Sequence, residues 1–134
     1  MARLDAPTAL ALLRIATGLV VFPHGVRKLM KGPVTAIGKQ MANHGFPELF
    51  AYVVTLGELA GILMVVGLYT RFASAAVAVT MAGIALVVNS GQLAVIGTGK
   101  STGFELSLLL SIAAALCALT VPTRFSLDAR RRRG

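Results

Sequence analysis

Long runs of apolar residues dominate the chain. Four such runs cover about residues 8–28, 48–69, 72–96 and 103–121, and short polar segments separate them. A helix needs about 20 mainly apolar residues to cross the hydrocarbon core of a bilayer, and the runs lack the strict alternation of apolar and polar residues that indicates strands. The pattern therefore predicts four membrane-spanning helices. Because their connections are short, we expect an antiparallel, up-down-up-down bundle.

The connection between the first two runs is the longest, and it has a helical pattern of its own. Pro33 suits the first turn of a helix, and Gly45 followed by Pro47 suits the end of one. Between them, apolar residues recur at a spacing of three or four: Val34, Ile37 and Met41. This predicts a short amphipathic helix over about residues 33–44 that lies on the membrane surface. The alternative is an irregular loop.

Composition supports a single membrane domain. The chain has 134 residues, of which 56% are hydrophobic and 13% are charged, whereas about 25% of the residues in a soluble protein are charged. A soluble protein of this size has too little polar surface to cover so much apolar mass, and the same numbers exclude an intrinsically disordered chain. We expect one all-α integral membrane domain over residues 1–134.

The net charge of +8 bears on orientation and partners. The basic residues are not interleaved with stacking aromatic residues, so nucleic acid is not an expected partner. Under the positive-inside rule, the side of the membrane richer in Lys and Arg is cytoplasmic. The side that would hold both termini has seven such residues (Arg3, Arg71, Arg124 and Arg130 to Arg133), and the other side has five (Arg27, Lys28, Lys31, Lys39 and Lys100). We expect a multi-pass plasma-membrane protein with both termini in the cytoplasm. Its basic tail, residues 122–134, is expected to be disordered and to contact anionic lipids.

Two ionisable residues interrupt the first two apolar runs near their middle. Arg14 lies six residues into the first run, and Glu58 lies ten residues into the second. At 1.5 Å rise per residue, in a core about 30 Å thick, the two differ in height by roughly 6 Å. An unpaired charge in lipid is costly, so we predict an Arg14–Glu58 ion pair near the midplane. Such a pair either sets the register of two helices or takes part in chemistry.

A second polar set lies toward the outer ends of the runs. His24 and Lys28 are one turn apart and share a helix face; Asn89 and Gln92 close the third run, and Glu105 opens the fourth. Because these residues fall at one depth, we predict a ligand pocket or proton pathway in the outer half of the bundle, roofed by the surface helix. Its predicted lining is His24, Lys28, Asn89 and Glu105. The alternative is that each side chain simply extends to water at the membrane edge.

Other kinds of site have little support in the sequence. His24 and His44 are the two histidines, and their spacing matches no metal-ligand motif, so no metal site is expected. The single cysteine, Cys117, excludes a disulfide within the chain. No nucleophile–base triad, phosphate-binding glycine loop or nucleotide motif is visible.

The polar and glycine motifs together resemble those of the DoxX family of small four-helix bacterial and archaeal membrane proteins. The resemblance covers nearly the whole chain. It rests on Arg14 with Gly18, His24-Gly25-x-x-Lys28, Gly45-Phe46-Pro47, Glu58, Gly67-Leu68-Tyr69-Thr70-Arg71, Glu105 and Arg124-Phe125-Ser126-Leu127-Asp128, in that order. The chain departs from the family pattern at Pro122-Thr123, where a glycine is common.

This resemblance implies a membrane component of a redox system. Members of the family are linked with membrane redox complexes, including the membrane subunit of an archaeal thiosulfate:quinone oxidoreductase, and with oxidative-stress complexes. It therefore implies a quinone- or thiol-linked subunit, with quinone as the candidate ligand. The chain has no electron-transfer motif, so it is not a complete oxidoreductase alone, and a partner protein or a second copy is expected. The alternatives are a non-catalytic assembly subunit for a protein or lipid and, less favoured because no internal repeat is visible, a small oligomeric transporter.

Overall fold

The computed structural model describes residues 4–32, 34–95, 103–120 and 125–134, and every regular element in those ranges is a helix. In chain order the helices are α1 (Ala6–Lys31), α2 (Val34–Asn43), α3 (Phe50–Leu59), α4 (Gly61–Val66), α5 (Thr70–Gly83), the π-helix η1 (Ile84–Val88), the 3-10 helix η2 (Ser90–Val95), α6 (Gly103–Leu119) and α7 (Leu127–Arg131). The predicted all-α class is therefore confirmed. A few predicted features lie outside the described residues: Pro33, the end of the third run at Ile96, Lys100, and the segment 121–124 with Arg124.

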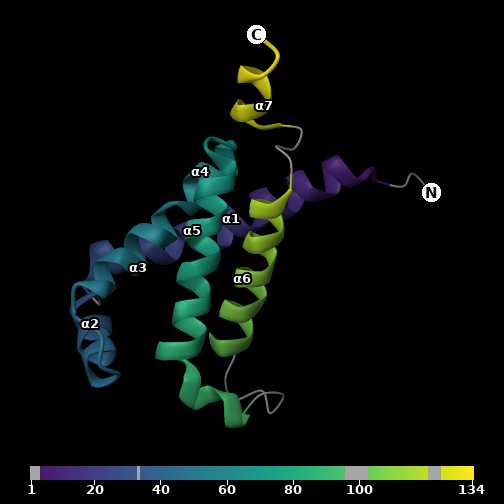
Figure 1. Ribbon diagram of the computed structural model, residues 1–134. Coiled ribbons are helices and arrows are strands. Elements are labelled where there is room, and N and C mark those ends of the chain that lie inside the picture. Colours follow the sequence, from purple (N-terminus) through teal and green to yellow (C-terminus); the bar gives the residue numbers. More distant parts are fainter. Residues whose placement is uncertain (1–3, 33, 96–102, 121–124) are drawn as a thin grey trace.

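The helices form two groups that cross: α5 with α6, and α1 with α3 and α4. Helices α5 and α6 run side by side in opposite directions, and α1 crosses them obliquely (Figure 1). Helices α3 and α4 pack along α1, while α2 packs on α3. The main core forms where α1, α4, α5 and α6 meet, around Val21, Met64, Val77 and Ala114. The last helix, α7, lies beyond the ends of α4 and α6 (Figure 1).

The exposed side chains of the helices are those expected of a membrane protein. Two helical stretches, Ala6–Lys31 and Thr70–Val88, are long and apolar enough to cross a bilayer, although only 33% of the apolar part of each is buried inside the fold. Large side chains such as Leu19, Phe72 and Val79 remain exposed. A contiguous apolar surface of this kind suits lipid rather than water. The stretches Phe50–Val66 and Gly103–Leu119 are apolar but shorter, so the four-span arrangement stays a prediction.

The second and third apolar runs are less regular than predicted. The second breaks at Ala60, where α3 gives way to α4, and it ends at Gly67, which has a φ of +71°. The third changes from α5 to the π-helix η1 before reaching Asn89. The helix predicted over residues 33–44 is present as Val34–Asn43. Hydrophobic periodicity shows where the helices lie, but it carries no information on these internal breaks.

Close backbone contacts set the spacing between α1 and its neighbours. A Cβ added to Gly18 of α1 would lie 2.5 Å from the carbonyl oxygen of Gly61 in α4, and one added to Gly25 would lie 3.1 Å from the Cβ of Glu58 in α3. Small residues at helix contacts are typical of membrane proteins because they let backbones approach. The close approach at Gly25 brings the α3 backbone beside the C-terminal end of α1.

The C-terminal tail differs from its prediction. A disordered end is expected from the sequence, but the described part contains α7, which is fastened to the turn before α5. The Asp128 carboxylate accepts hydrogen bonds from the backbone N–H groups of Tyr69 (3.0 Å) and Thr70 (2.7 Å), and the Asp128 N–H donates to the Gly67 carbonyl at 3.0 Å. The first residues of α5 lack helical acceptors for their N–H groups, and a carboxylate satisfies them. The prediction of a disordered tail is therefore wrong for residues 125–134.

Candidate functional site

A cavity of about 240 Å³ lies among α1, α2, α3, α5, η1 and α6. Most of its wall is apolar: Val21, Ile37, Met81, Ile84, Val88, Leu106 and Leu110. Five polar side chains also line it: His24, Lys28, Glu58, Asn89 and Ser107. A mainly apolar cavity with a few polar groups is the usual form of a small-molecule site.

The strongest polar feature of this cavity is an ion pair. The Nζ of Lys28 lies 2.5 Å from Oε1 of Glu58, and the two side chains are 16% and 2% exposed. The second carboxylate oxygen, Oε2 of Glu58, is buried and has no hydrogen-bond partner among the described residues. A buried carboxylate oxygen normally finds a donor, so Oε2 of Glu58 is an unsatisfied polar atom in a residue that lines the cavity.

The predicted Arg14–Glu58 pair is wrong. The buried Arg14 guanidinium donates to the carbonyl oxygens of Met64, Val65 (3.3 Å) and Phe125 (2.9 Å). Met64 and Val65 lie at the end of α4, where carbonyls lack helical partners and the helix dipole is negative.

The error comes from the register between the first two apolar runs. In the structure Gly18 faces Gly61 and Gly25 faces Glu58. This register puts Lys28, rather than Arg14, beside the carboxylate.

Three of the four residues predicted to line a pocket, His24, Lys28 and Asn89, line this cavity together. The fourth, Glu105, is exposed on α6 and is not part of the lining. Gln92 is also absent from the lining; its Oε1 accepts a hydrogen bond from the Phe104 N–H at 3.2 Å, at the start of α6.

The hydrogen bonds of the polar lining leave groups free to act on a ligand. The Nδ1 of His24 lies 2.8 Å from the Val20 carbonyl oxygen; since a carbonyl only accepts, Nδ1 carries the proton and Nε2 of the neutral ring is an acceptor. The Nδ2 of Asn89 donates to Oγ of Ser107 at 3.4 Å, and an amide NH₂ has a second hydrogen to donate.

Sequence reasoning misses two members of this site. It identifies Glu58 as an intramembrane acid but assigns it to another partner, and it does not single out Ser107. The spacing of Ser107 with Leu110 and Ala114 on the buried face of α6 is the available signal, but small polar residues on such a face also serve packing. Within the described ranges, no three His, Cys, Asp or Glu side chains gather to hold a metal ion.

A second polar cluster, which we call the tail clasp, consists of Arg14, Gly67, Thr70, Ser126 and Asp128. A Cβ at Gly67 would lie 2.6 Å from Nη1 of Arg14 and 2.6 Å from Cα of Ser126, so only glycine fits between them. Burial alone would raise the pKa of the Asp128 carboxyl, but the hydrogen bonds from Thr70 and Tyr69, together with the charge of Arg131, outweigh it and lower that pKa below its usual value. In the clasp, the Asp128 and Arg14 side chains bind backbone groups of distant segments, which indicates a structural role.

Comparison with known proteins identifies a family whose match covers part of the cavity lining. The family model described as DoxX matches residues 9–90, a stretch that contains His24, Lys28, Glu58 and Asn89. A protein of Bacillus subtilis (strain 168) described as "Putative oxidoreductase CatD" is 36% identical over 80 residues, which are 58% of this chain and 57% of that protein. The chain thus spans little more than half the length of this relative. No solved structure matches the chain.

Proposed function

Because the chain belongs to the DoxX family, we propose that it is the quinone-binding membrane subunit of a redox system and that the quinone ring occupies the central cavity. The observation that carries this proposal is the Lys28–Glu58 ion pair, buried in the wall of an otherwise mainly apolar cavity. The similarity to a protein described as an oxidoreductase supports a redox role. The apolar outer surface of the helices is consistent with a lipid-soluble ligand.

The size and lining of the cavity suit a substituted six-membered ring. An apolar cavity of about 150 Å³ holds a benzene molecule, and this one has about 240 Å³. Apolar side chains from α5, η1 and α6 would contact the ring faces. The carbonyl oxygens of a quinone are acceptors, and the Lys28 ammonium and the second Nδ2 hydrogen of Asn89 are donors that could bind them.

The polar groups have roles in quinone reduction. Converting a quinone to a quinol adds two electrons and two protons, one proton at each carbonyl oxygen. Lys28 would stabilise the negative charge that develops on one oxygen as electrons arrive, and the free Oε2 of Glu58 and Nε2 of His24 are atoms that could carry protons to it. The electrons would come from a partner protein or from a cofactor that the partner holds.

Binding of a quinone analogue tests the proposal. The matched variants are Glu58→Gln and Glu105→Gln, which make the same substitution inside and outside the cavity lining. Glu58 holds the Lys28 ammonium in the cavity wall, and a hydrogen bond from a charged donor contributes about 1.5–3 kcal/mol. Glu58→Gln releases that donor and should therefore weaken binding about tenfold or more, whereas Glu105→Gln should leave the Kd unchanged. Titration calorimetry in detergent measures both values. Equal Kd values for the two variants would contradict the assignment.

A third variant separates binding from stability. Asn89→Ala leaves the Lys28–Glu58 pair intact and removes one donor, so it should weaken analogue binding about fivefold, as expected for a hydrogen bond of about 1 kcal/mol. The purified wild-type protein should also release a quinone on extraction with organic solvent. If the extract contains phospholipid and no quinone, and no analogue binds, the chain is instead a non-catalytic assembly subunit.

A further inference from the structure

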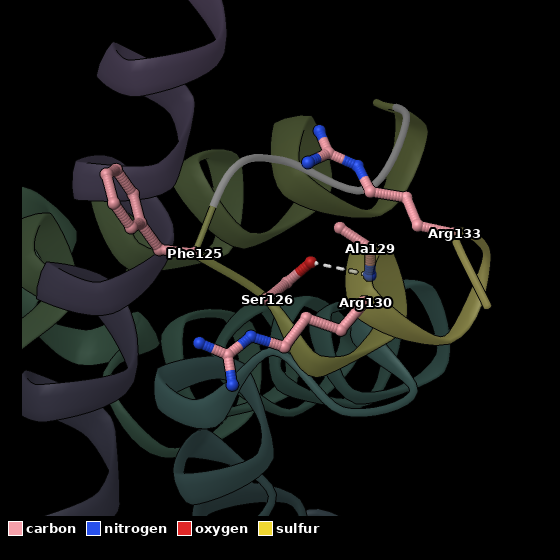
Figure 2. A pocket seen from close by; sticks show the side chains of 5 residues that line it. All are labelled: Phe125, Ser126, Ala129, Arg130 and Arg133. Carbon is pink, nitrogen blue, oxygen red and sulfur yellow. Dashed lines mark hydrogen bonds between the residues drawn. The ribbon is translucent and has the colours of Figure 1, made fainter.

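The tail carries a hollow that the proposed redox function does not use. It has a volume of about 520 Å³ and is lined by Phe125, Ser126, Ala129, Arg130 and Arg133. Figure 2 shows the guanidinium groups of Arg130 and Arg133 on either side of Ser126, both extending in the direction of Phe125. None of these five lining residues is acidic.

The two arginines are held in place by the fold. The Oγ of Ser126 accepts a hydrogen bond from the Ala129 N–H at 3.1 Å (Figure 2), which begins α7. The clasp between Asp128 and the start of α5 then anchors this helix to the bundle. Arg133 lies in the turn that follows α7, where its N–H donates to the Arg130 carbonyl at 3.1 Å, so the two residues stay close together.

The neighbouring arginines point elsewhere. Arg131 and Arg132 line a different hollow of about 250 Å³, together with Tyr69 and Arg71, and the Arg131 guanidinium lies 5.9 Å from the centroid of the Tyr69 ring. The run of four arginines is thus divided between two hollows. This division provides a control with the same charge.

We propose that the hollow between Arg130 and Arg133 binds the phosphate group of an anionic phospholipid. Guanidinium groups match phosphate oxygens with paired hydrogen bonds. A free phosphate offers the same oxygens, but the tail also exposes apolar side chains: Phe125 is 75% exposed and Leu127 is 42% exposed. Basic residues beside exposed apolar ones are typical of a segment that lies at the lipid headgroups, so these side chains would contact the acyl chains.

Native mass spectrometry of the full chain, with phosphatidylglycerol or phosphatidylcholine added, tests this proposal. One double variant carries Arg130→Gln and Arg133→Gln. The matched control is a second double variant, which carries Arg131→Gln and Arg132→Gln. Each basic residue near an anionic lipid contributes about fivefold to binding. The first double variant should therefore lose about 25-fold in affinity for phosphatidylglycerol, and the control should stay within about threefold of wild type. Phosphatidylcholine should bind all three proteins weakly.

Further measurements distinguish a bound lipid from a free anion and from attraction by the total charge. Phe125→Ala should weaken phosphatidylglycerol binding and leave inorganic phosphate binding unchanged, and inorganic phosphate should displace the lipid only at much higher concentration. Amide exchange at Thr70 verifies that each variant keeps α7 anchored.

Equal losses in the two double variants would mean unspecific attraction by the total charge and would overturn the site. Displacement of the lipid by phosphate at equal concentration would mean a free-anion site and would overturn the lipid assignment.

Discussion

Each of the two deeply buried ionic residues is stabilised in its own way. Arg14 is surrounded by backbone carbonyls at the end of α4 and in the tail, so its charge faces dipoles rather than a counter-ion. Glu58 has a counter-ion, Lys28, but one of its oxygens lacks a partner among the described residues. The carbonyls that hold Arg14 belong to the chain itself, which indicates a structural role. The open carboxylate oxygen of Glu58 indicates a role with a ligand.

The Lys28–Glu58 pair predicts an asymmetric cost of mutation. Lys28→Met leaves a carboxylate at 2% exposure without a counter-ion, which should lower the free energy of unfolding by about 3–5 kcal/mol at neutral pH. Glu58→Gln leaves Lys28, which is 16% exposed and can extend its ammonium toward water, so the loss should be nearer about 1–2 kcal/mol.

Unfolding in mixed micelles measures both variants. Acid should reduce the effect of both variants, because a protonated carboxyl carries no charge and the ion pair of the wild type is then lost as well. Glu105→Gln is the control for a substitution at an exposed site. A larger cost for Glu58→Gln than for Lys28→Met would mean that the unpaired Lys28 ammonium cannot reach water and would contradict this asymmetry.

At the scale of elements, the tail clasp joins three segments that are far apart in the sequence. Gly67 ends α4 in the left-handed region, which turns the chain so that the first N–H groups of α5 face Asp128 of α7. Arg14 of α1 reaches the same place through the Phe125 carbonyl. The clasp thus couples the position of α7 to the packing of α1 on α4.

The lowered pKa of Asp128 gives the clasp a pH dependence with a defined sign. The carboxylate is favoured in the folded state, so its stabilisation is fully present above the ordinary carboxyl pKa of about 3.9 and is lost as the pH falls through the lower folded value. Asp128→Asn keeps one acceptor and loses the charge, and it should cost about 1 kcal/mol at neutral pH.

The difference in unfolding free energy between wild type and Asp128→Asn, measured from pH 7 downward, checks this prediction. It should shrink below about pH 4 and vanish once the folded carboxyl is protonated. The Thr70 amide resonance should shift over the same range in wild type alone. A difference that stays constant down to the lowest pH would show that the Asp128 charge contributes nothing to the clasp.

At the scale of the whole molecule, the arrangement of the helices bears on topology. Four apolar helical stretches, with α5 and α6 antiparallel (Figure 1), are compatible with four membrane crossings. An even number of crossings puts both termini on one side, and the arginine-rich tail favours the cytoplasm. Helix α2 would then lie at the outer surface.

Cysteine labelling in intact cells tests this topology. In a Cys117→Ser background, Arg3→Cys and Arg132→Cys should resist a membrane-impermeant maleimide, and Lys39→Cys on the exposed side of α2 should react with it. Permeabilised cells provide the control, since Arg132→Cys should then react. Labelling of both terminal positions, without labelling at Lys39→Cys, would reverse the orientation, and labelling of only one terminus would contradict an even number of crossings.

Sequence reasoning locates the helices well and their interruptions poorly. Long apolar runs identify helices because burial in lipid and in the core depends on local composition, so α1 and α6 are predicted nearly to their ends, whereas α5 ends at Gly83 inside a run predicted to reach residue 96. The breaks at Ala60 and at the π-helix η1 depend on how α3 and α5 meet their neighbours. The docking of α7 is missed because Asp128 looks like any acidic residue in a basic tail until the α5 N-terminus lies beside it.

The sequence by itself determined that the chain is helical and suited to a membrane. It also determined that His24 and Lys28 share one face of the first helix, at the depth of the polar residues in the other runs. These properties depend on composition and helix periodicity, which are local. Only the tertiary structure decided that Glu58 pairs with Lys28, that Arg14 binds carbonyls and that Glu105 lies outside the cavity. Each of these depends on the register and rotation of one helix against another. That register follows from close contacts such as Gly18 with Gly61. Because Arg14 and Lys28 lie about 21 Å apart along α1, the register decides which of them meets Glu58.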